Sequence, residues 1–252
     1  MKDLFSINNK VILVTGGGGS GMANVVAKAM AKYGAFVYAL DLKISPNNKA
    51  NENLVYLKCD ITNIQKFENI CKKIFKEHNK IDILVNAAGV TFPDSSQNGY
   101  PIKKWKKTME VNLDAAFYCS KIVAKFMKKN STGSIINFTS INAEMAFPDN
   151  PAYVASKGGL KMLGKALARD LGRYGIRVNN IGPGYMKTEM TRKSWNDTKK
   201  RKARTSRTLV GRWGNKEEII APCIFLASDA SSYVTGQDIY VDGGWLTNGL
   251  SE

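Results

Sequence analysis

Short apolar runs without regular polar alternation recur along this 252-residue chain, and they constrain its fold more than any other feature. Runs of this kind, rich in Ile, Val, Leu and Phe, are typical of strands that are buried on both faces of a parallel sheet. The expected strands are residues 11–15, 36–41, 54–58, 81–85, 134–138, 176–180 and 238–241.

Helical patterns fill the intervals between these runs, with apolar side chains recurring at helical spacing. The expected helices are residues 23–33, 153–173 and 216–227, and a segment marked by Ala115, Cys119, Ile122 and Phe126. Alternating strands and helices predict an α/β fold, a doubly wound parallel sheet of about seven strands with helices on both faces. No linker, repeat or low-complexity tract divides residues 1–252, so we expect a single domain.

A glycine-rich segment, TGGGGSGMA at residues 15–23, directly follows the first expected strand and opens the first expected helix. Glycine suits a tight turn there, because a Cβ would keep the backbone away from a phosphate, and the helix N-terminus offers free N–H groups to the anion. A glycine-rich surface loop is the alternative interpretation. The position between strand and helix favours a site for the pyrophosphate of a dinucleotide.

Two aspartates follow the next strands. Asp41 ends the second strand twenty residues after Gly21. An acid there can accept hydrogen bonds from the adenosine ribose hydroxyls and repels a 2′-phosphate, which favours NAD. A solvated strand-end residue is the alternative, and Lys43 leaves some room for NADP. Asp60 follows the third strand, where it would either contact the adenine or cap the next helix.

Tyr153 and Lys157 are four residues apart near the start of an expected helix, so both side chains project from one face. A phenol has a pKa near 10 and is a poor base at neutral pH, but a neighbouring ammonium group would lower that pKa. A Tyr–Lys pair at this spacing also arises by chance in many helices. The pair gains weight from Ser140, which follows the fifth strand, and from Asn112 in the preceding helix.

The chain has 37 Lys and Arg against 21 Asp and Glu, a formal net charge of +16. Such an excess favours acidic partners such as nucleic acid, anionic lipid or an anionic small molecule. Residues 187–212 hold ten basic and two acidic side chains, and residues 101–130 hold eight and two. Nothing here resembles a nucleic-acid-binding module, so we expect a small-molecule partner, with neither nucleic acid nor membrane.

The cysteines Cys59, Cys71, Cys119 and Cys223 are widely spaced without a CxxC pair, and His78 is the single histidine. We therefore expect no metal site of the His/Cys type and predict that the cysteines are reduced core residues. The N-terminal segment lacks the apolar region of a signal peptide, and no apolar run approaches the length of a membrane span. A cytoplasmic protein is the expectation.

The chain resembles the short-chain dehydrogenase/reductase family over essentially its whole length. Besides the glycine-rich turn and the Tyr–Lys pair, the resemblance rests on NAAG at residues 86–89, VNL around Asn112 and RVNNIGPG at residues 177–184. GRWG at residues 211–214 and VDGG at residues 241–244 are also typical of the family. The resemblance implies a Rossmann fold and hydride transfer between a nicotinamide cofactor and a secondary alcohol or its ketone.

The resemblance also implies a role for each catalytic residue. Tyr153 would exchange a proton with the substrate oxygen, and Lys157 would lower the tyrosine pKa and bind the nicotinamide ribose. Ser140 would hold the substrate oxygen, and Asn112 would support a water-linked proton relay. Thr188 would meet the carboxamide, unless it serves as a cap or turn residue. The implied cofactor-binding residues are Gly16, Gly19, Ser20, Gly21, Met22, Asp41, Asp60, Ile61, Asn86, Ala87, Gly89, Tyr153, Lys157, Pro183, Gly184, Met186 and Thr188.

The chain departs from the family pattern in three places. Four residues instead of three separate Gly16 from Gly21, and Ala23 replaces the third glycine, which predicts a slightly widened phosphate loop. Only 18 residues lie between Asp41 and Asp60, too few for the usual helix, so the adenosine side should be more open. The NAAG motif varies the common NNAG, a change that affects no catalytic role.

Residues 187–212 correspond to the substrate lid of the family. Their basic side chains either form a solvated helical face or bind an anionic substrate, for which Arg192, Arg204 and Arg207 are the best candidates. We expect an NAD-dependent enzyme for a small polar or anionic sugar, sugar acid or hydroxy acid. It would form a homotetramer or homodimer through helices at residues 105–129 and 153–173. The alternatives are a 3-oxoacyl-[acyl-carrier-protein] reductase using NADP and a non-catalytic nucleic-acid-binding protein of this fold.

Overall fold

The apolar runs pair into one parallel sheet in the computed structural model, which describes residues 3–95 and 99–249. The strands are β1 (Val11–Thr15), β2 (Phe36–Asp41), β3 (Leu54–Lys58), β4 (Ile83–Asn86), β5 (Gly133–Phe138), β6 (Ile176–Pro183) and β9 (Asp238–Val241). Their order across the sheet is β3-β2-β1-β4-β5-β6-β9, and every pairing is parallel. The prediction of a seven-stranded doubly wound sheet is confirmed. Of the expected bounds, those of β4, β5 and β6 shift by one to three residues.

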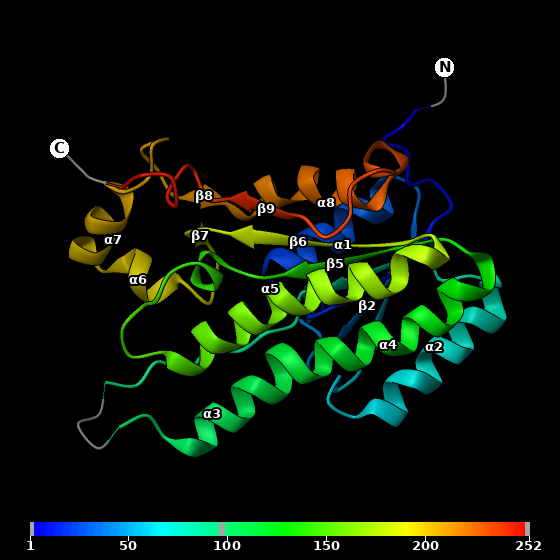
Figure 1. Ribbon diagram of the computed structural model, residues 1–252, viewed down its shortest axis with the longest axis horizontal. Helices are drawn as coiled ribbons and strands as arrows, with labels where there is room; N and C mark the ends of the chain where they lie inside the picture. The colour runs from blue at the N-terminus through cyan, green and yellow to red at the C-terminus, as the bar shows by residue number, and fades with distance from the viewer. Residues whose placement is uncertain (1–2, 96–98, 250–252) are drawn as a thin grey trace.

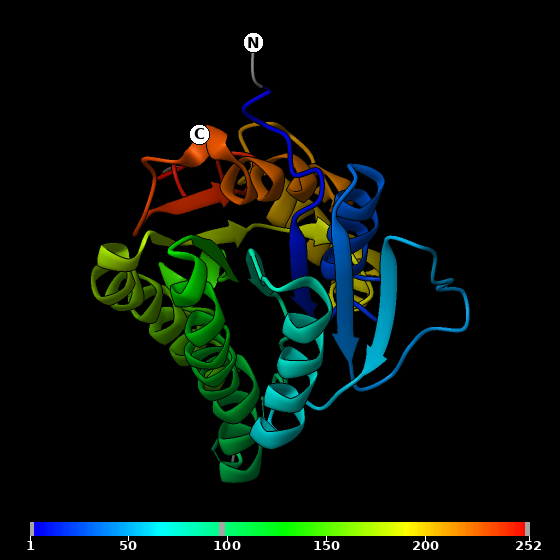
Figure 2. The same cartoon turned by 90° about the vertical axis from the view of Figure 1, so that its right-hand side faces the viewer.

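Helices cover both faces of this sheet (Figures 1 and 2). The helices are α1 (Met22–Lys32) and α8 (Ile220–Ala227) on one face, and α2 (Ile64–His78), α4 (Ala115–Met127) and α5 (Pro151–Leu171) on the other. Side chains alternate along each strand, so Leu13 packs under α2 and α4 whereas Ile12 and Val14 pack under α1 and α8. Burial on both faces explains why the strands lack polar alternation.

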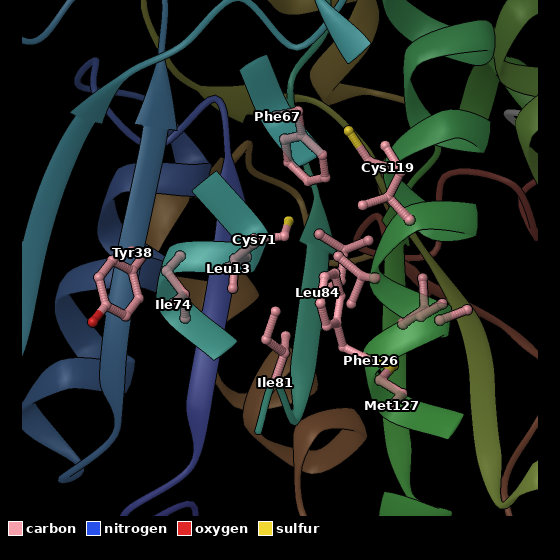
Figure 3. Close-up of a cluster of buried hydrophobic side chains, with 14 of the residues drawn as sticks. Leu13, Tyr38, Phe67, Cys71, Ile74, Ile81, Leu84, Cys119, Phe126 and Met127 are labelled. Atoms are coloured by element: carbon pink, nitrogen blue, oxygen red, sulfur yellow. The ribbon is translucent and has the colours of Figure 1, made fainter. Parts of the chain in front are cut away.

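Figure 3 shows the core between β1, β4, α2 and α4, where Phe67 and Cys71 face Leu13 and Leu84. All four cysteines are buried and unbridged, as predicted. Burial raises the pKa of the Cys71 thiol, which keeps it protonated and unreactive. Among the described residues there is no cluster of metal-binding side chains and no helix able to span a membrane.

Two helical stretches differ in detail from the expectation. Helix α2 is capped by the Asn63 side chain, which accepts a hydrogen bond from the Lys66 N–H, a signal visible in the sequence but overlooked. Helix α3 (Ile102–Met109) continues through one π-helical turn (Glu110–Asp114) into α4, so Asn112 lies in that turn and not in a regular helix. As expected, residues 42–53 form no helix; they form a loop beside β3 (Figure 2).

The basic segment of residues 187–212 forms a separate layer at one end of the molecule. It enters through β7 (Met186–Lys187), continues through α6 (Arg192–Asn196) and α7 (Thr198–Thr205), and leaves through β8 (Gly214–Asn215), which pairs with β7. Figure 1 shows α6 and α7 at the end where β6 stops and α5 begins. This is the carboxyl edge of the sheet, where α/β proteins bind their ligands.

Candidate active site

A cleft of about 450 Å³ lies along the carboxyl edge of the sheet. Its walls come from four places: the glycine-rich loop after β1, the ends of β2 and β3, the segment after β4, and the start of the basic layer. The loops are joined by Thr15, whose hydroxyl oxygen accepts hydrogen bonds from the Ala87 and Ala88 N–H groups at 3.1 and 3.2 Å. The cleft therefore forms where the sequence predicted a dinucleotide site.

The glycine-rich loop leaves room for a phosphate group. Gly16 has φ +76°, and a Cβ there would lie 2.8 Å from the Ala88 Cα, so only glycine fits. Gly19 and Gly21 have open space where a Cβ would be. Gly21 precedes α1 without any side-chain cap, which leaves N–H groups of its first turn free for an anion. These features fit the pyrophosphate of a nicotinamide dinucleotide.

Gly18, one of the four residues between Gly16 and Gly21, is held against β2 and the loop that follows it. The Gly18 N–H donates to Asp41 Oδ2 at 3.0 Å, and its carbonyl accepts from the Ser45 N–H at 2.8 Å and from Asn48 Nδ2 at 2.7 Å. Asp41 still lines the cleft, with its second carboxylate oxygen uncommitted to any described residue. This bond orients Asp41, whereas the expected widening of the loop stays a prediction. A more open adenosine side stays a prediction.

Asp60 lines the cleft and does not cap α2. Its Oδ1 accepts hydrogen bonds from the Thr62 N–H at 2.9 Å and the Thr62 hydroxyl at 2.7 Å, while Asn63 caps the helix. Burial raises the pKa of Asp60, but the bonds from Thr62 and the nearby Lys107 and Lys66 outweigh burial and lower it. Of the two roles expected for Asp60, the cap is wrong, because the helix starts four residues later.

Ser140, Tyr153 and Lys157 come together beside the cleft. Ser140 follows β5; its hydroxyl donates to Asn142 Oδ1 at 3.2 Å and lies close enough to the Tyr153 hydroxyl to lower the pKa of that tyrosine. The Lys157 ammonium lies 5.6 Å from the centre of the Tyr153 ring and donates to the Phe138 carbonyl at 2.6 Å. A Cβ on Gly89 would lie 3.6 Å from Lys157 Nζ, so the lysine borders the cleft wall. The predicted side-chain constellation therefore exists.

The pKa values of this trio differ from the expectation. Burial raises the pKa of Tyr153, and the hydrogen bond with Ser140 lowers it only in part. Burial also lowers the pKa of Lys157 to about 8. Lys157 is not among the groups that set the Tyr153 pKa in this structure, so its predicted effect on the tyrosine stays a prediction. With a pKa of about 8, Lys157 remains mostly protonated at neutral pH.

Asn112 uses its side chain to hold the segment after β4. Its Oδ1 accepts from the Val90 N–H at 2.8 Å, and its Nδ2 donates to the Val90 carbonyl at 2.9 Å and to Ser156 Oγ at 3.1 Å. Asn112 is 1% exposed. These contacts commit the amide to positioning the cleft wall next to α5. The water-linked relay predicted for Asn112 stays a prediction.

The other cofactor-binding residues separate into two groups. Those lining the cleft are Gly16, Gly19, Ser20, Gly21, Met22, Asp41, Asp60, Ile61, Ala87, Gly89 and Thr188. Those that do not line it are Asn86, Tyr153, Lys157, Pro183, Gly184 and Met186. Asn86 turns into the core, where its Nδ2 donates to Ser120 Oγ at 2.9 Å and Asn137 Oδ1 at 3.0 Å, so its side chain does not face a cofactor.

Thr188 lines the cleft and also makes a turn. Its N–H donates to Thr191 Oγ1 at 3.1 Å, so the turn role considered for Thr188 is present beside the expected cofactor contact. The sequence reasoning missed further lining residues: Ala23, Leu40, Leu42, Cys59, Ala88, Val90, Lys107, Val111, Phe138, Glu189 and Met190. Most adjoin a predicted residue in the chain, and this adjacency was the available signal.

Known proteins resemble this chain over nearly its whole length. A sequence profile described as enoyl-(acyl carrier protein) reductase matches residues 17–246. The chain is 34% identical to 5-keto-D-gluconate 5-reductase of Escherichia coli (strain K12), over 98% of this chain and 99% of that protein. It is 35% identical to gluconate 5-dehydrogenase of Gluconobacter oxydans (strain 621H), over 96% of each chain.

Among solved structures, the fold is similar to a gluconate 5-dehydrogenase from Burkholderia cenocepacia J2315 in complex with NADP and tartrate. The TM-score is 0.88 and the identity 31%, over 97% of this chain and 98% of that chain. The profile and these relatives span nearly the whole chain, and the solved structure agrees with the seven-stranded fold. The chain belongs to the short-chain dehydrogenase/reductase family.

Proposed function

We propose that this protein is a pyridine-nucleotide-dependent dehydrogenase that interconverts a secondary alcohol and a ketone in a sugar acid. The observation that carries the proposal is the contact between Ser140 and Tyr153, with Lys157 beside them, at the edge of a cleft that fits a dinucleotide. The names of the full-length relatives, which act on gluconate and keto-gluconate, support a sugar acid as the substrate.

Ser140, Tyr153 and Lys157 can transfer one proton to or from the substrate oxygen while a hydride is transferred between the substrate carbon and the nicotinamide. In oxidation, Tyr153 Oη takes the proton of the substrate hydroxyl as the carbon loses hydride; in reduction it returns the proton. Ser140 Oγ holds the substrate oxygen, where charge changes in the transition state. The Lys157 ammonium stabilises the phenolate form of Tyr153. A bound nicotinamide supplies the hydride chemistry.

We propose NAD as the preferred cofactor, because Asp41 presents a carboxylate at the end of β2 where the adenosine ribose of a dinucleotide lies. A 2′-phosphate would meet that negative charge. The Burkholderia relative holds NADP, so preference must be measured on this chain. The ratio of kcat/KM with NAD to that with NADP decides it, and a strong preference for NADP would overturn the assignment.

The experiment that tests the function is a dehydrogenase assay with both nucleotides over gluconate, other sugar acids, hydroxy acids, neutral polyols and acyl thioesters. We expect the highest kcat/KM with a sugar acid. Turnover of acyl thioesters alone would instead favour an acyl-carrier-protein reductase. Salt-dependent binding of nucleic acid without turnover of any alcohol would point to a non-catalytic role.

We also propose a homotetramer or homodimer assembled through α4 and α5. Tyr118 on α4 and Met162 on α5 are 37% and 60% exposed, and Trp105 on α3 is 38% exposed, so large apolar side chains face outward on these helices. Sedimentation equilibrium of the native protein and of Met162→Lys tests this. A monomeric native protein would refute it.

A further inference from the structure

An aromatic cluster stands at the carboxyl edge of the sheet, beyond β5 and β6. Phe147 comes from the loop between Ser140 and Tyr153, Tyr185 follows β6, and Trp245 follows β9. The ring centres of Phe147 and Tyr185 are 6.2 Å apart, and those of Phe147 and Trp245 are 5.5 Å apart. The loop bearing Phe147 connects Ser140 and Tyr153 along the chain, so the cluster lies at the same edge of the sheet as these two residues.

Two arginines of the basic layer lie on these rings. The Arg204 guanidinium carbon is 4.6 Å from the centre of the Tyr185 ring, and that of Arg207 is 4.2 Å from the Trp245 ring. Both side chains are half-buried. Within residues 3–95 and 99–249, neither forms an ion pair with a carboxylate. Each is thus a partly desolvated cation with no carboxylate partner in the described part of the chain.

The other arginine candidate is committed elsewhere. Arg192 is exposed and pairs with Glu189 at 2.8 Å, on the outer side of the short helix α6. Arg212 likewise forms two 2.7 Å bonds with the carboxylate of Glu218. The sequence could not separate Arg192 from Arg204 and Arg207, because all three lie in one basic segment. Their contacts in the folded chain distinguish them, because Arg192 pairs with a carboxylate whereas Arg204 and Arg207 lie on aromatic rings.

A guanidinium that stacks on a ring still presents its N–H edge, which matches the geometry of a carboxylate. Arg207 already donates one N–H to the Asn248 carbonyl at 3.3 Å. Placing a cation in a half-buried site without a counter-ion costs free energy, which a bound anion would offset.

We propose that Arg204, supported by Arg207, binds the carboxylate of the substrate, with Tyr185 and Trp245 holding the guanidinium planes. This assignment rests on the proposed function, since it requires a substrate with a carboxylate. It places the acid group of the substrate under α7 and its reacting carbon toward Ser140 and Tyr153. The basic layer then selects sugar acids over neutral polyols.

The test compares Arg204→Gln with Arg173→Gln, a control that removes the same charge. Arg173 also stacks on a tyrosine, 4.9 Å from the Tyr174 ring, but it lies at the opposite end of α5. The assay measures kcat/KM for the best sugar acid and for the neutral polyol of equal length. We expect Arg204→Gln to lose about 10- to 100-fold on the acid and less than about twofold on the polyol.

A second measurement does not depend on whether the carboxylate ligand is itself turned over. Tartrate, the dicarboxylate bound in the Burkholderia relative, serves as an inhibitor, and its inhibition constant should rise about tenfold or more in Arg204→Gln but not in Arg173→Gln. If the native enzyme has the same kcat/KM for neutral polyols as for sugar acids, the proposed sugar-acid function fails. If the native enzyme prefers acids but Arg204→Gln keeps that preference, or loses both substrates equally, the assignment of Arg204 fails while the function stands.

Discussion

Replacing Gly18 with alanine tests whether this residue of the phosphate loop is packed against β2. A Cβ at this position would lie 2.6 Å from Asp41 Cβ, 2.6 Å from Ile44 Cδ1 and 2.7 Å from the Lys43 carbonyl oxygen. The Lys43 carbonyl oxygen belongs to the backbone and Asp41 Cβ is attached to it, so neither can turn away as a flexible side chain would. The loop itself must therefore move. Moving it stretches the 3.0 Å bond from the Gly18 N–H to Asp41.

The magnitude follows from two opposing effects. Overpacking costs about 1–3 kcal/mol, and stretching a hydrogen bond to a carboxylate adds to this cost. Alanine also restricts the unfolded chain, which stabilises by about 0.4–1 kcal/mol. We expect Gly18→Ala to lower the free energy of unfolding by about 2 kcal/mol, which is about 4–8 °C in Tm for a chain of this size.

The matched control is Gly19→Ala, because a Cβ at Gly19 meets nothing within 4 Å. Urea and thermal unfolding of the cofactor-free proteins give both values, and Gly19→Ala should remain within about 0.5 kcal/mol of the native protein or slightly above it. Equal stability of the two variants would show that Gly18 is not packed as described. A stable Gly18→Ala protein would also remove the argument that this residue orients Asp41.

Three further predictions concern the catalytic and cofactor residues. Tyr153→Phe should lower kcat by about 10²–10⁴-fold while NAD binding, measured by fluorescence titration, stays unchanged; turnover at the native rate would refute Tyr153 as the proton donor and acceptor. Asp41→Asn should lower the NAD to NADP ratio of kcat/KM by about tenfold, because it removes the charge that opposes a 2′-phosphate; an unchanged ratio would remove Asp41 from cofactor selection. Lys157 has a folded pKa of about 8, below the usual value of 10.5, so between these values the unfolded chain binds a proton that the folded chain lacks. The free energy of unfolding should therefore rise from pH 8 to pH 10 in the native protein relative to Lys157→Met, and a constant difference between the two would contradict the buried lysine.

Much of the fold was predictable because its signals are local. Strands buried on both faces read as continuous apolar runs, and the turn between β1 and α1 needs glycine wherever it occurs. The Tyr153 and Lys157 pair lies one helical turn apart, so the sequence alone places both side chains on one face of α5. These features identified the family, the cleft and the trio of Ser140, Tyr153 and Lys157.

Other features depended on partners distant in the chain, which a single sequence does not reveal. Asn86 turns into a polar contact with Ser120 and Asn137 because β4, β5 and α4 meet there. The net direction of the Tyr153 pKa follows from how completely the fold excludes water from that side chain, and spacing carries no information on burial.

The basic segment, residues 187–212, shows most clearly which properties were evident from the sequence and which depended on the tertiary structure. Its charge was evident from the sequence, since ten basic side chains stand against two acidic ones in residues 187–212. Only the tertiary structure decided that Arg192 is neutralised by Glu189 while Arg204 and Arg207 rest on aromatic rings brought from β6 and β9. Charge is a property of composition, whereas the availability of a charge depends on which neighbours the folded chain places beside it.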